Sequence, residues 1–196
     1  MPDARASVSS LLALALLGLT AAAEEKSKKE CLLEEKAAHA VRRERAPVAG
    51  QPAIQPVCLH NVWTNETLPV DVAHPPSPDT VNVFLRDHYT NQGTAMDPRL
   101  LGVVLGAARA FGSRFVEVVS GFRAPKYNLL LRKKGHEVAR ESEHPRGEAV
   151  DFRLPGTPTR KLLRWVRALR LGGVGYYPRS SFVHADVGRV RFWRGH

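Results

Sequence analysis

The chain has 196 residues, of which 43% are hydrophobic and 24% charged, so a folded core is expected and a fully disordered or collagen-like chain is excluded. Its 29 Lys and Arg against 19 Asp and Glu give a formal net charge of +10, which favours an anionic partner such as nucleic acid, an anionic lipid surface or an anionic polymer of the cell envelope. The two cysteines, Cys31 and Cys58, are too few for a disulfide scaffold or a four-cysteine zinc site.

The first 23 residues have the layout of a secretory signal peptide. An uncharged, mainly apolar run, LLALALLGLTAAA at residues 11–23, follows a short polar start and precedes the charged stretch EEKSKKE. Ala21 and Ala23 form the small-residue pattern of a cleavage site, so residues 1–23 are predicted to be removed; a buried or membrane-surface helix is the alternative interpretation. We therefore expect secretion across the inner membrane, into the periplasm, with no transmembrane segment after cleavage.

Residues 24–57 are predicted to form a tether, and residues 58–196 the folded domain. The tether is first charged and then rich in Pro and Ala, which is typical of a linker. A disulfide between Cys31 and Cys58 is compatible with an exported protein, but the spacing alone leaves open whether the two sulfur atoms meet.

The domain contains predicted helices and strands without an internal repeat. In chain order we expect a hairpin over residues 59–72 that turns near Asn65, a helix over 81–89 capped by Asp79, a helix from Pro98 to a stop at Gly112, a strand over 115–120, a helix over 129–135, a strand over 147–154, a helix that opens at Thr157 and Pro158, and three short strands over 172–178, 181–188 and 189–193. The predicted helices precede and separate the strands, and the last strands are expected to form a meander. This order predicts an α+β fold. In this fold a small antiparallel sheet carries the site and packs against helices.

Strand alternation places polar side chains on one face of each of two predicted strands. In the strand at 147–154, Asp151 lies opposite the apolar set that suits the core. In the strand at 181–188, His184 and Asp186 project together from the polar face. If the two strands are neighbours, Asp151 and His184 can reach a common point.

A histidine just before the first of these strands completes a possible metal-ligand set. His144 lies in a predicted turn, and Gly147 lets the chain curl back so that the imidazole can reach the same point as Asp151 and His184. Two imidazoles and one carboxylate are the ligand set of a catalytic zinc site, whose fourth position is left to water. Zinc lowers the pKa of that water toward about 7 and polarises a carbonyl, which suits hydrolysis of an amide. Each spacing is common by chance when taken singly, so the joint pattern carries the prediction.

An ordered series of motifs strengthens this prediction. The series consists of Ser120–Arg123 (SGFR), Ser142–Asp151 (SEHPRGEAVD), Gly172–Pro178 (GGVGYYP) and Phe182–Trp193 (FVHADVGRVRFW). It resembles the murein endopeptidase K-like branch of the D-Ala-D-Ala metallocarboxypeptidase and lysostaphin-like zinc peptidases. The resemblance extends over residues 58–196, and the length and order of the series make it specific.

The resemblance implies a secreted zinc endopeptidase that hydrolyses the peptide cross-links of bacterial peptidoglycan, with one zinc ion bound by His144, Asp151 and His184. It also implies that Arg123 holds a substrate carboxylate or stabilises the oxyanion, which a guanidinium fork suits; a structural salt bridge is the alternative. Ser142 and Tyr176 complete the predicted substrate-binding set; for Tyr176, packing in the core is the alternative interpretation.

The general base does not carry over from the resemblance. Many relatives have a second histidine two residues before the last ligand, and the vancomycin-resistance dipeptidases have a glutamate three residues before it, where this chain has Phe182 and Ser181. Asp186, which shares a strand face with the last ligand, is the predicted catalytic base or instead orients an imidazole ligand. Glu148 and Glu143 are the further candidates.

Two other functions compete with this interpretation. A domain of the same fold can hold zinc and bind peptidoglycan without turnover, an alternative that hydrolysis of purified sacculi would exclude. A nucleic-acid partner rests on the net charge alone and does not suit an exported protein. We therefore expect peptidoglycan peptides as the partner and no nucleic acid, while the sequence leaves the oligomeric state open.

Overall fold

The structure, a computed structural model, describes residues 56–71, 73–133 and 142–195. The predicted signal peptide and the predicted tether up to residue 55, Cys31 included, lie outside the described residues. Cys58 is disulfide-bonded. Among the described residues, no helix combines the length and the apolar character needed to cross a membrane.

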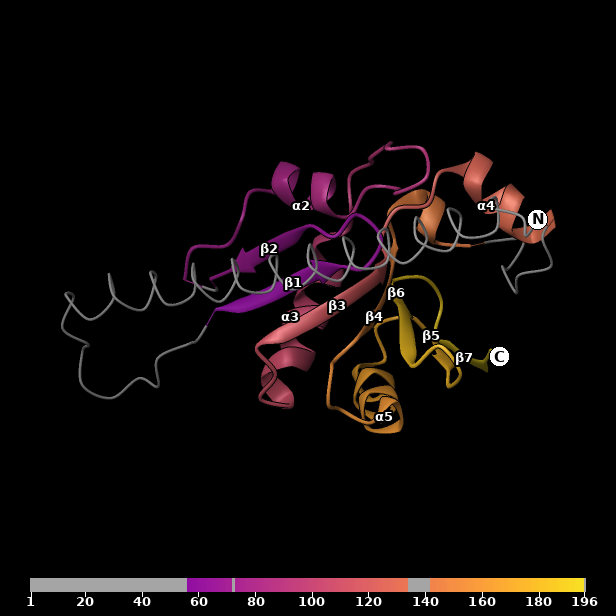
Figure 1. The fold of residues 1–196 in the computed structure, drawn as a ribbon. Helices are drawn as coiled ribbons and strands as arrows, with labels where there is room; N and C mark the ends of the chain where they lie inside the picture. Colours follow the sequence, from indigo (N-terminus) through magenta and orange to yellow (C-terminus); the bar gives the residue numbers. More distant parts are fainter. Residues whose placement is uncertain (1–55, 72, 134–141, 196) are drawn as a thin grey trace, which may run out of the picture. The chain divides into compact units, whose positions relative to one another are not determined.

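The strands of the described chain form one sheet, and helices pack around it, which confirms the predicted α+β fold (Figure 1). In chain order the elements are β1 (Val57–Asn61), β2 (Thr67–Val70), α2 (Pro78–Phe84), α3 (Pro98–Ala110), β3 (Phe115–Ser120), α4 (Pro125–Lys133), the short 3-10 helix η1 (His144–Arg146), β4 (Ala149–Arg153), α5 (Thr159–Leu169), β5 (Gly173–Tyr177), β6 (Phe182–Asp186) and β7 (Arg191–Arg194).

The seven strands lie in the order β2-β1-β3-β4-β6-β5-β7. Neighbouring strands are antiparallel except for two parallel pairs, β1 with β3 and β5 with β7. The predicted hairpin is confirmed: β1 pairs with β2, and Asn65 in the turn between them has a left-handed φ of 57°.

The predicted meander of the last three strands is wrong. β7 lies beside β5 and parallel to it, so the chain that leaves β6 crosses the start of β5 before it forms β7. Gly172 makes this close crossing possible, because a Cβ atom there would lie 2.1 Å from the carbonyl oxygen of Asp186. The crossing brings Arg191 and Trp193 of β7 into register with β5.

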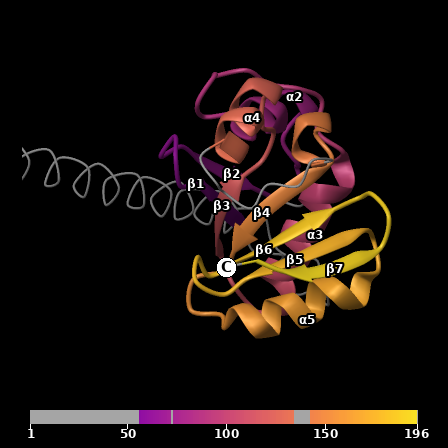
Figure 2. The same cartoon turned by 90° about the vertical axis from the view of Figure 1, so that its right-hand side faces the viewer.

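Helices α3 and α5 pack against one face of the sheet, with the apolar core beneath them (Figures 1 and 2). Val150 and Phe152 of β4, and Val183 and Ala185 of β6, are at most 2% exposed and belong to this core. The predicted core faces of both strands are therefore confirmed. The alternate residues of these strands project from the other face.

Two helices begin earlier than predicted. α2 begins at Pro78, with Ser77 rather than Asp79 as its N-cap, because the Ser77 hydroxyl accepts a hydrogen bond from the backbone N–H three residues on (3.2 Å). α4 begins at Pro125, whose fixed φ suits the first position of a helix. The early start of α4 shortens the loop that carries Arg123.

Candidate metal centre

Strands β4 and β6 are antiparallel neighbours, which is the condition for the predicted site. Asp151 lies directly opposite His184, and Ala149 lies directly opposite Asp186. Side chains of directly opposed residues share a face and lie close together. The carboxylate and the imidazole therefore meet on the face of the sheet away from the buried Val150 and its neighbours.

His144 reaches the same point from η1, which precedes β4. Gly147 ends η1 with a left-handed φ of 72°, and its carbonyl oxygen accepts a hydrogen bond from the N–H of Asp97 (2.9 Å). Nδ1 of His144 lies 2.7 Å from the carbonyl oxygen of Gly121. Because a carbonyl oxygen can only accept, Nδ1 carries the hydrogen and Nε2 keeps its lone pair.

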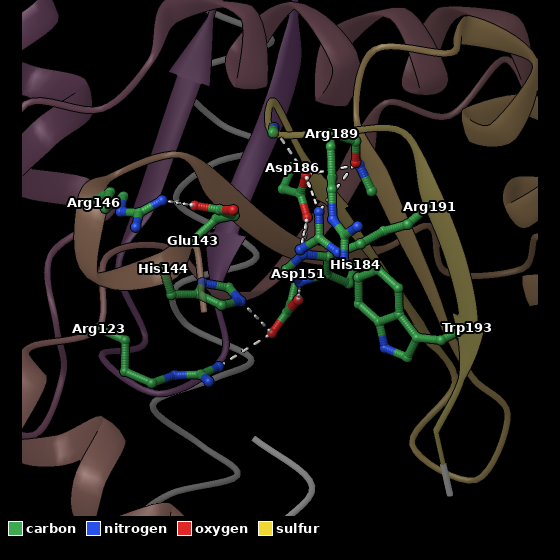
Figure 3. Close-up of polar contacts among 12 residues, drawn as sticks. Arg123, Glu143, His144, Arg146, Asp151, His184, Asp186, Arg189, Arg191 and Trp193 are labelled. Carbon is green, nitrogen blue, oxygen red and sulfur yellow. Dashed lines mark hydrogen bonds and ion pairs between the residues drawn. The ribbon is translucent and has the colours of Figure 1, made fainter. Parts of the chain in front are cut away.

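The three side chains predicted as ligands converge (Figure 3). Nε2 of His144 lies 3.2 Å from Oδ2 of Asp151, and Nδ1 of His184 lies 2.7 Å from Oδ1 of the same carboxylate. One potential ligand atom from each residue lies within 4.8 Å of the other two. All three residues are buried, with 2 to 6% of their surface exposed.

This set of side chains fits a divalent metal ion. Nε2 of His144 is buried without a hydrogen-bond partner, although it faces a carboxylate oxygen. Nε2 of His184 lies 3.1 Å from Oδ2 of Asp186, so a neutral His184 that donates from Nε2 also directs the lone pair of Nδ1 at Asp151. Acceptor atoms that converge in this way are held together by a cation, and two imidazoles with one carboxylate suit zinc.

Burial and the neighbouring charges set the ionisation of the three residues. Burial disfavours the charged form of Asp151, but His144 and His184 outweigh it and hold the pKa of the carboxyl well below its ordinary value. Burial lowers the pKa of His144 and so favours its neutral form. His184 has a raised pKa in spite of its burial, because it hydrogen-bonds to Asp151 and Asp186. A charged carboxylate and a neutral imidazole are the forms that bind metal, so the shifts of Asp151 and His144 favour binding, whereas the raised pKa of His184 means that a metal would displace a proton from that ring.

Asp186 lies behind His184 rather than among the converging ligands. It contacts Nε2 of His184, the ring nitrogen turned away from the other two ligands. The 1% exposed carboxylate also accepts hydrogen bonds from the N–H groups of Gly173 (2.7 Å) and Gly188 (3.0 Å), and it pairs with Arg191 (2.9 Å). Burial opposes its ionisation, but the hydrogen bonds from His184 and the backbone prevail and lower the pKa of Asp186 to about 2. These surroundings favour the orienting role over that of a base.

Arg123 lies at the edge of the cluster, in the loop between β3 and α4 (Figure 3). One guanidinium nitrogen donates to Oδ2 of Asp151 (3.3 Å) and to Oγ of Ser120 (3.1 Å). The Nε atom is buried and has no hydrogen-bond partner. The ion pair of the alternative interpretation is present, and the predicted contact of Arg123 with a substrate stays a prediction.

The two glutamates near η1 lie in different surroundings. Glu143 pairs through Oε2 with Arg146 (2.9 Å), and its side chain is only 12% exposed (Figure 3). The charge of Glu148 acts on Arg99 in the first turn of α3 and helps to raise the pKa of that guanidinium. Ser142 is half-buried and immediately precedes Glu143 in the chain.

Tyr176 is not brought to the ligands. It pairs in register with the buried Val183, and therefore lies on the face of the sheet opposite that of His184. Trp193 lies beside His184 instead, with ring centroids 5.0 Å apart (Figure 3). Arg191 and Trp193 are further neighbours of the site that no sequence pattern predicted. Alternation places both side chains on one face of β7, but it does not show which strand lies beside β7.

Comparison with known proteins gives a family and several relatives. The family model described as peptidoglycan L,D-endopeptidase MepK matches residues 57–193. The probable peptidoglycan L,D-endopeptidase MepK of Haemophilus influenzae is 40% identical over 117 residues, which are 59% of this chain and 63% of that protein. The peptidoglycan L,D-endopeptidase MepK of Escherichia coli K12 is 38% identical over 114 residues, which are 58% of this chain and 63% of that protein.

The chain thus spans less than two thirds of the length of these curated relatives. No solved structure matches it significantly. The matched family model covers more than half of the chain and includes His144, Asp151 and His184. The chain therefore belongs to the peptidoglycan L,D-endopeptidase MepK family.

Proposed function

We propose that this chain is a zinc-dependent endopeptidase that hydrolyses peptide cross-links of bacterial peptidoglycan. One observation carries the proposal: Nε2 of His144, a buried acceptor without a partner, converges with Asp151 and His184. Membership of the MepK family supports the substrate class. The names of the relatives specify an L,D-endopeptidase and support cleavage of an L,D peptide bond.

One zinc ion is proposed to bind His144, Asp151 and His184. When bound, zinc polarises a carbonyl as a Lewis acid and lowers the pKa of a water in its open position to about 7. The protein orients both imidazoles for this purpose. The carbonyl of Gly121 accepts the Nδ1–H of His144, and Asp186 accepts the Nε2–H of His184, so that the other nitrogen of each ring is presented to the ion.

Arg123 is proposed to bind the substrate. Its ion pair with Asp151 holds the guanidinium next to the ligands, and its buried Nε–H has no partner. A guanidinium in this place binds a substrate carboxylate, or the oxygen of the scissile carbonyl as negative charge develops on it. Ser142, half-buried beside η1, belongs to the same proposed substrate-binding set.

Glu143 is the proposed general base, which takes a proton from the attacking water and passes it to the leaving amine. Asp186 is surrounded by donors behind His184 and is proposed as the residue that positions this ring. Glu143 lies at the start of η1, and its Oε1 lies beside Gly188 of the turn after β6. This carboxylate therefore sits between two of the segments that carry the ligands.

The protein is further proposed to act in the periplasm. The predicted signal peptide supports export, and its removal leaves the formal charge of +10 unchanged because residues 1–23 contain one Asp and one Arg. A strongly positive protein is attracted to a wall polymer rich in carboxylates.

The test is digestion of purified sacculi, with mass spectrometry of the muropeptides. We expect cross-linked dimers to be converted to monomers, and we expect a chelator or the His184→Ala substitution to stop the conversion. Phe192→Ala is the matched control, because Phe192 is 44% exposed and lies on the opposite face of the sheet, in register with Val174. If the sacculi bind the protein but release no new muropeptide, the result would favour a non-catalytic binding domain. If a chelator does not affect cleavage, the result would contradict the proposed dependence on zinc.

A further inference from the structure

Four side chains from three separate segments form a continuous group of rings, here called the aromatic cluster: Trp63, His88, Tyr89 and Tyr127. Trp63 stacks on His88 with centroids 4.8 Å apart and ring planes 10° from parallel. His88 meets the edge of Tyr127 at 5.0 Å, and Tyr127 stacks on Tyr89 at 4.9 Å with ring planes 18° from parallel. The cluster joins the β1–β2 turn, the segment after α2 and the first turn of α4.

The two outer rings of the aromatic cluster are unusually exposed. Trp63 is 60% exposed and Tyr89 is 57% exposed, and none of the four rings belongs to the apolar core of the described residues. Each outer ring stacks on one partner ring and still leaves more than half of its residue's surface exposed. Adjacent exposed aromatic rings on a folded domain mark an interaction site more often than isolated exposed apolar residues do.

Hydrogen bonds hold the outer rings in place without a ligand. The indole N–H of Trp63 donates to the carbonyl oxygen of Val119 (2.9 Å). The buried Asp87 accepts from the N–H of Tyr89 (2.7 Å) through one oxygen and from the N–H of Ala124 (2.5 Å) through the other. Rings that are fixed before binding lose little conformational entropy when a ligand covers them.

The same hydrogen bonds connect the aromatic cluster to the metal centre. Val119, which anchors Trp63, precedes Ser120, a hydrogen-bond partner of Arg123. Ala124, which is bound to the segment of Tyr89 through Asp87, follows Arg123 directly. The charge of Arg123 also acts on His88 and Tyr127. The cluster therefore borders the proposed substrate-binding arginine.

The chemistry of the aromatic cluster suits a neutral ligand. Its rings carry no acidic or permanently charged group, and burial lowers the pKa of His88, which favours the neutral imidazole. A peptide rich in carboxylates would instead be drawn to Arg123. A pyranose sugar has an apolar C–H face and polar hydroxyls around its rim, which matches the exposed flat rings of Trp63 and Tyr89 and the hydroxyl at the rim of Tyr89.

We propose that the aromatic cluster binds the glycan strand of peptidoglycan by stacking N-acetylated sugar rings on Trp63 and Tyr89, while the metal centre holds the attached peptide. This assignment rests on the proposed function and adds a glycan subsite to it. It accounts for exposed aromatic rings that the chemistry of amide hydrolysis does not require.

The test is titration of the full chain with a tetramer of β-1,4-linked N-acetylglucosamine, by calorimetry and by tryptophan fluorescence. Trp63→Ala and Tyr89→Ala are each expected to weaken binding by about tenfold, the usual effect of losing a central aromatic contact. Trp63→Phe keeps a stacking ring and should recover part of the affinity. Phe192→Ala removes an exposed aromatic ring from the opposite face and should bind as the unchanged chain does.

A tetramer that does not bind, or that binds Trp63→Ala as tightly as the unchanged chain, would overturn the glycan assignment. The assignment would also be overturned, in favour of a peptide subsite, by a second result. In that result the chain does not bind the tetramer but binds a sugar-free cross-linked peptide, and Trp63→Ala weakens this binding. Because tetramer binding requires no hydrolysis, it decides the assignment even if the sacculus digestion shows no endopeptidase activity.

Discussion

Asp186 illustrates how contacts decide between roles that a strand pattern leaves open. Alternation on β6 correctly places Asp186 and His184 on one face of the sheet. The carboxylate reaches the outer nitrogen of the His184 ring and accepts further hydrogen bonds from two backbone N–H groups. We therefore propose that this buried carboxylate positions the imidazole, as partners of metal ligands commonly do.

The first prediction separates positioning from base catalysis. Asp186→Asn keeps the size of the side chain but removes its charge, so zinc affinity is expected to fall by about 10–100-fold. Glu143→Gln is expected to keep its zinc and lose about 10²-fold or more in turnover, the usual scale for general base catalysis. Competition with a chelator measures the affinity, and muropeptide release measures the turnover.

Glu148→Gln is the matched control, since the charge of Glu148 acts on Arg99 of α3. If Asp186→Asn keeps full zinc affinity and loses turnover on that scale, the two assignments must be exchanged.

Arg123 supports the second prediction at the residue scale. Arg123→Lys preserves the positive charge beside Asp151 but removes the guanidinium fork and its unpaired Nε–H. We expect kcat/KM on cross-linked muropeptides to fall by about tenfold or more while the zinc content stays at one ion per chain. Wild-type kinetics in this variant would assign Arg123 to the ion pair alone.

At the scale of elements, the position of His144 depends on how η1 joins β4. Gly147 ends η1 with a φ of 72°, and a Cβ atom there would lie 2.3 Å from the carbonyl oxygen of Ala95. The loop before α3 is therefore packed against this glycine, and both the left-handed backbone and the close contact require the absence of a side chain.

Gly156 provides a matched comparison for the third prediction, because its φ is 79° but its missing Cβ would meet no atom within 4 Å. Gly156→Ala should lower the free energy of unfolding by about 1 kcal/mol, the cost of a left-handed alanine. Gly147→Ala should cost more than about 2 kcal/mol, because the overlap with Ala95 adds to the backbone strain, and it should also weaken zinc binding through His144. Urea denaturation measures both values, and equal costs would contradict the close contact.

At the level of the whole molecule, the three proposed ligands come from three different elements, η1, β4 and β6. A metal that binds only the folded chain stabilises it, by about 2.7 kcal/mol when the free ion is at 100 times its Kd. The fourth prediction is that zinc raises the Tm of the chelator-treated protein by about 5–10 °C. His144→Ala should abolish this increase, and a Tm that is indifferent to zinc and chelator would argue against the site irrespective of activity.

Features that depend only on neighbouring residues could be predicted from the sequence. Period-two alternation assigned Val150 and Phe152 to the core and Asp151 to the other face, and Pro98 marked the start of α3. The residue types also predicted which three side chains converge, because two imidazoles and a carboxylate in that motif order suit zinc. These signals extend over only a few positions of the chain.

Tertiary structure alone decided which distant segments meet. Three features depend on contacts between segments that are far apart in the chain. They are the position of β7 on the far side of β5, the position of Asp186 behind His184, and the aromatic cluster. Local periodicity shows which face a side chain occupies but not which strand or loop lies opposite it, because strand order is set by how the whole core packs.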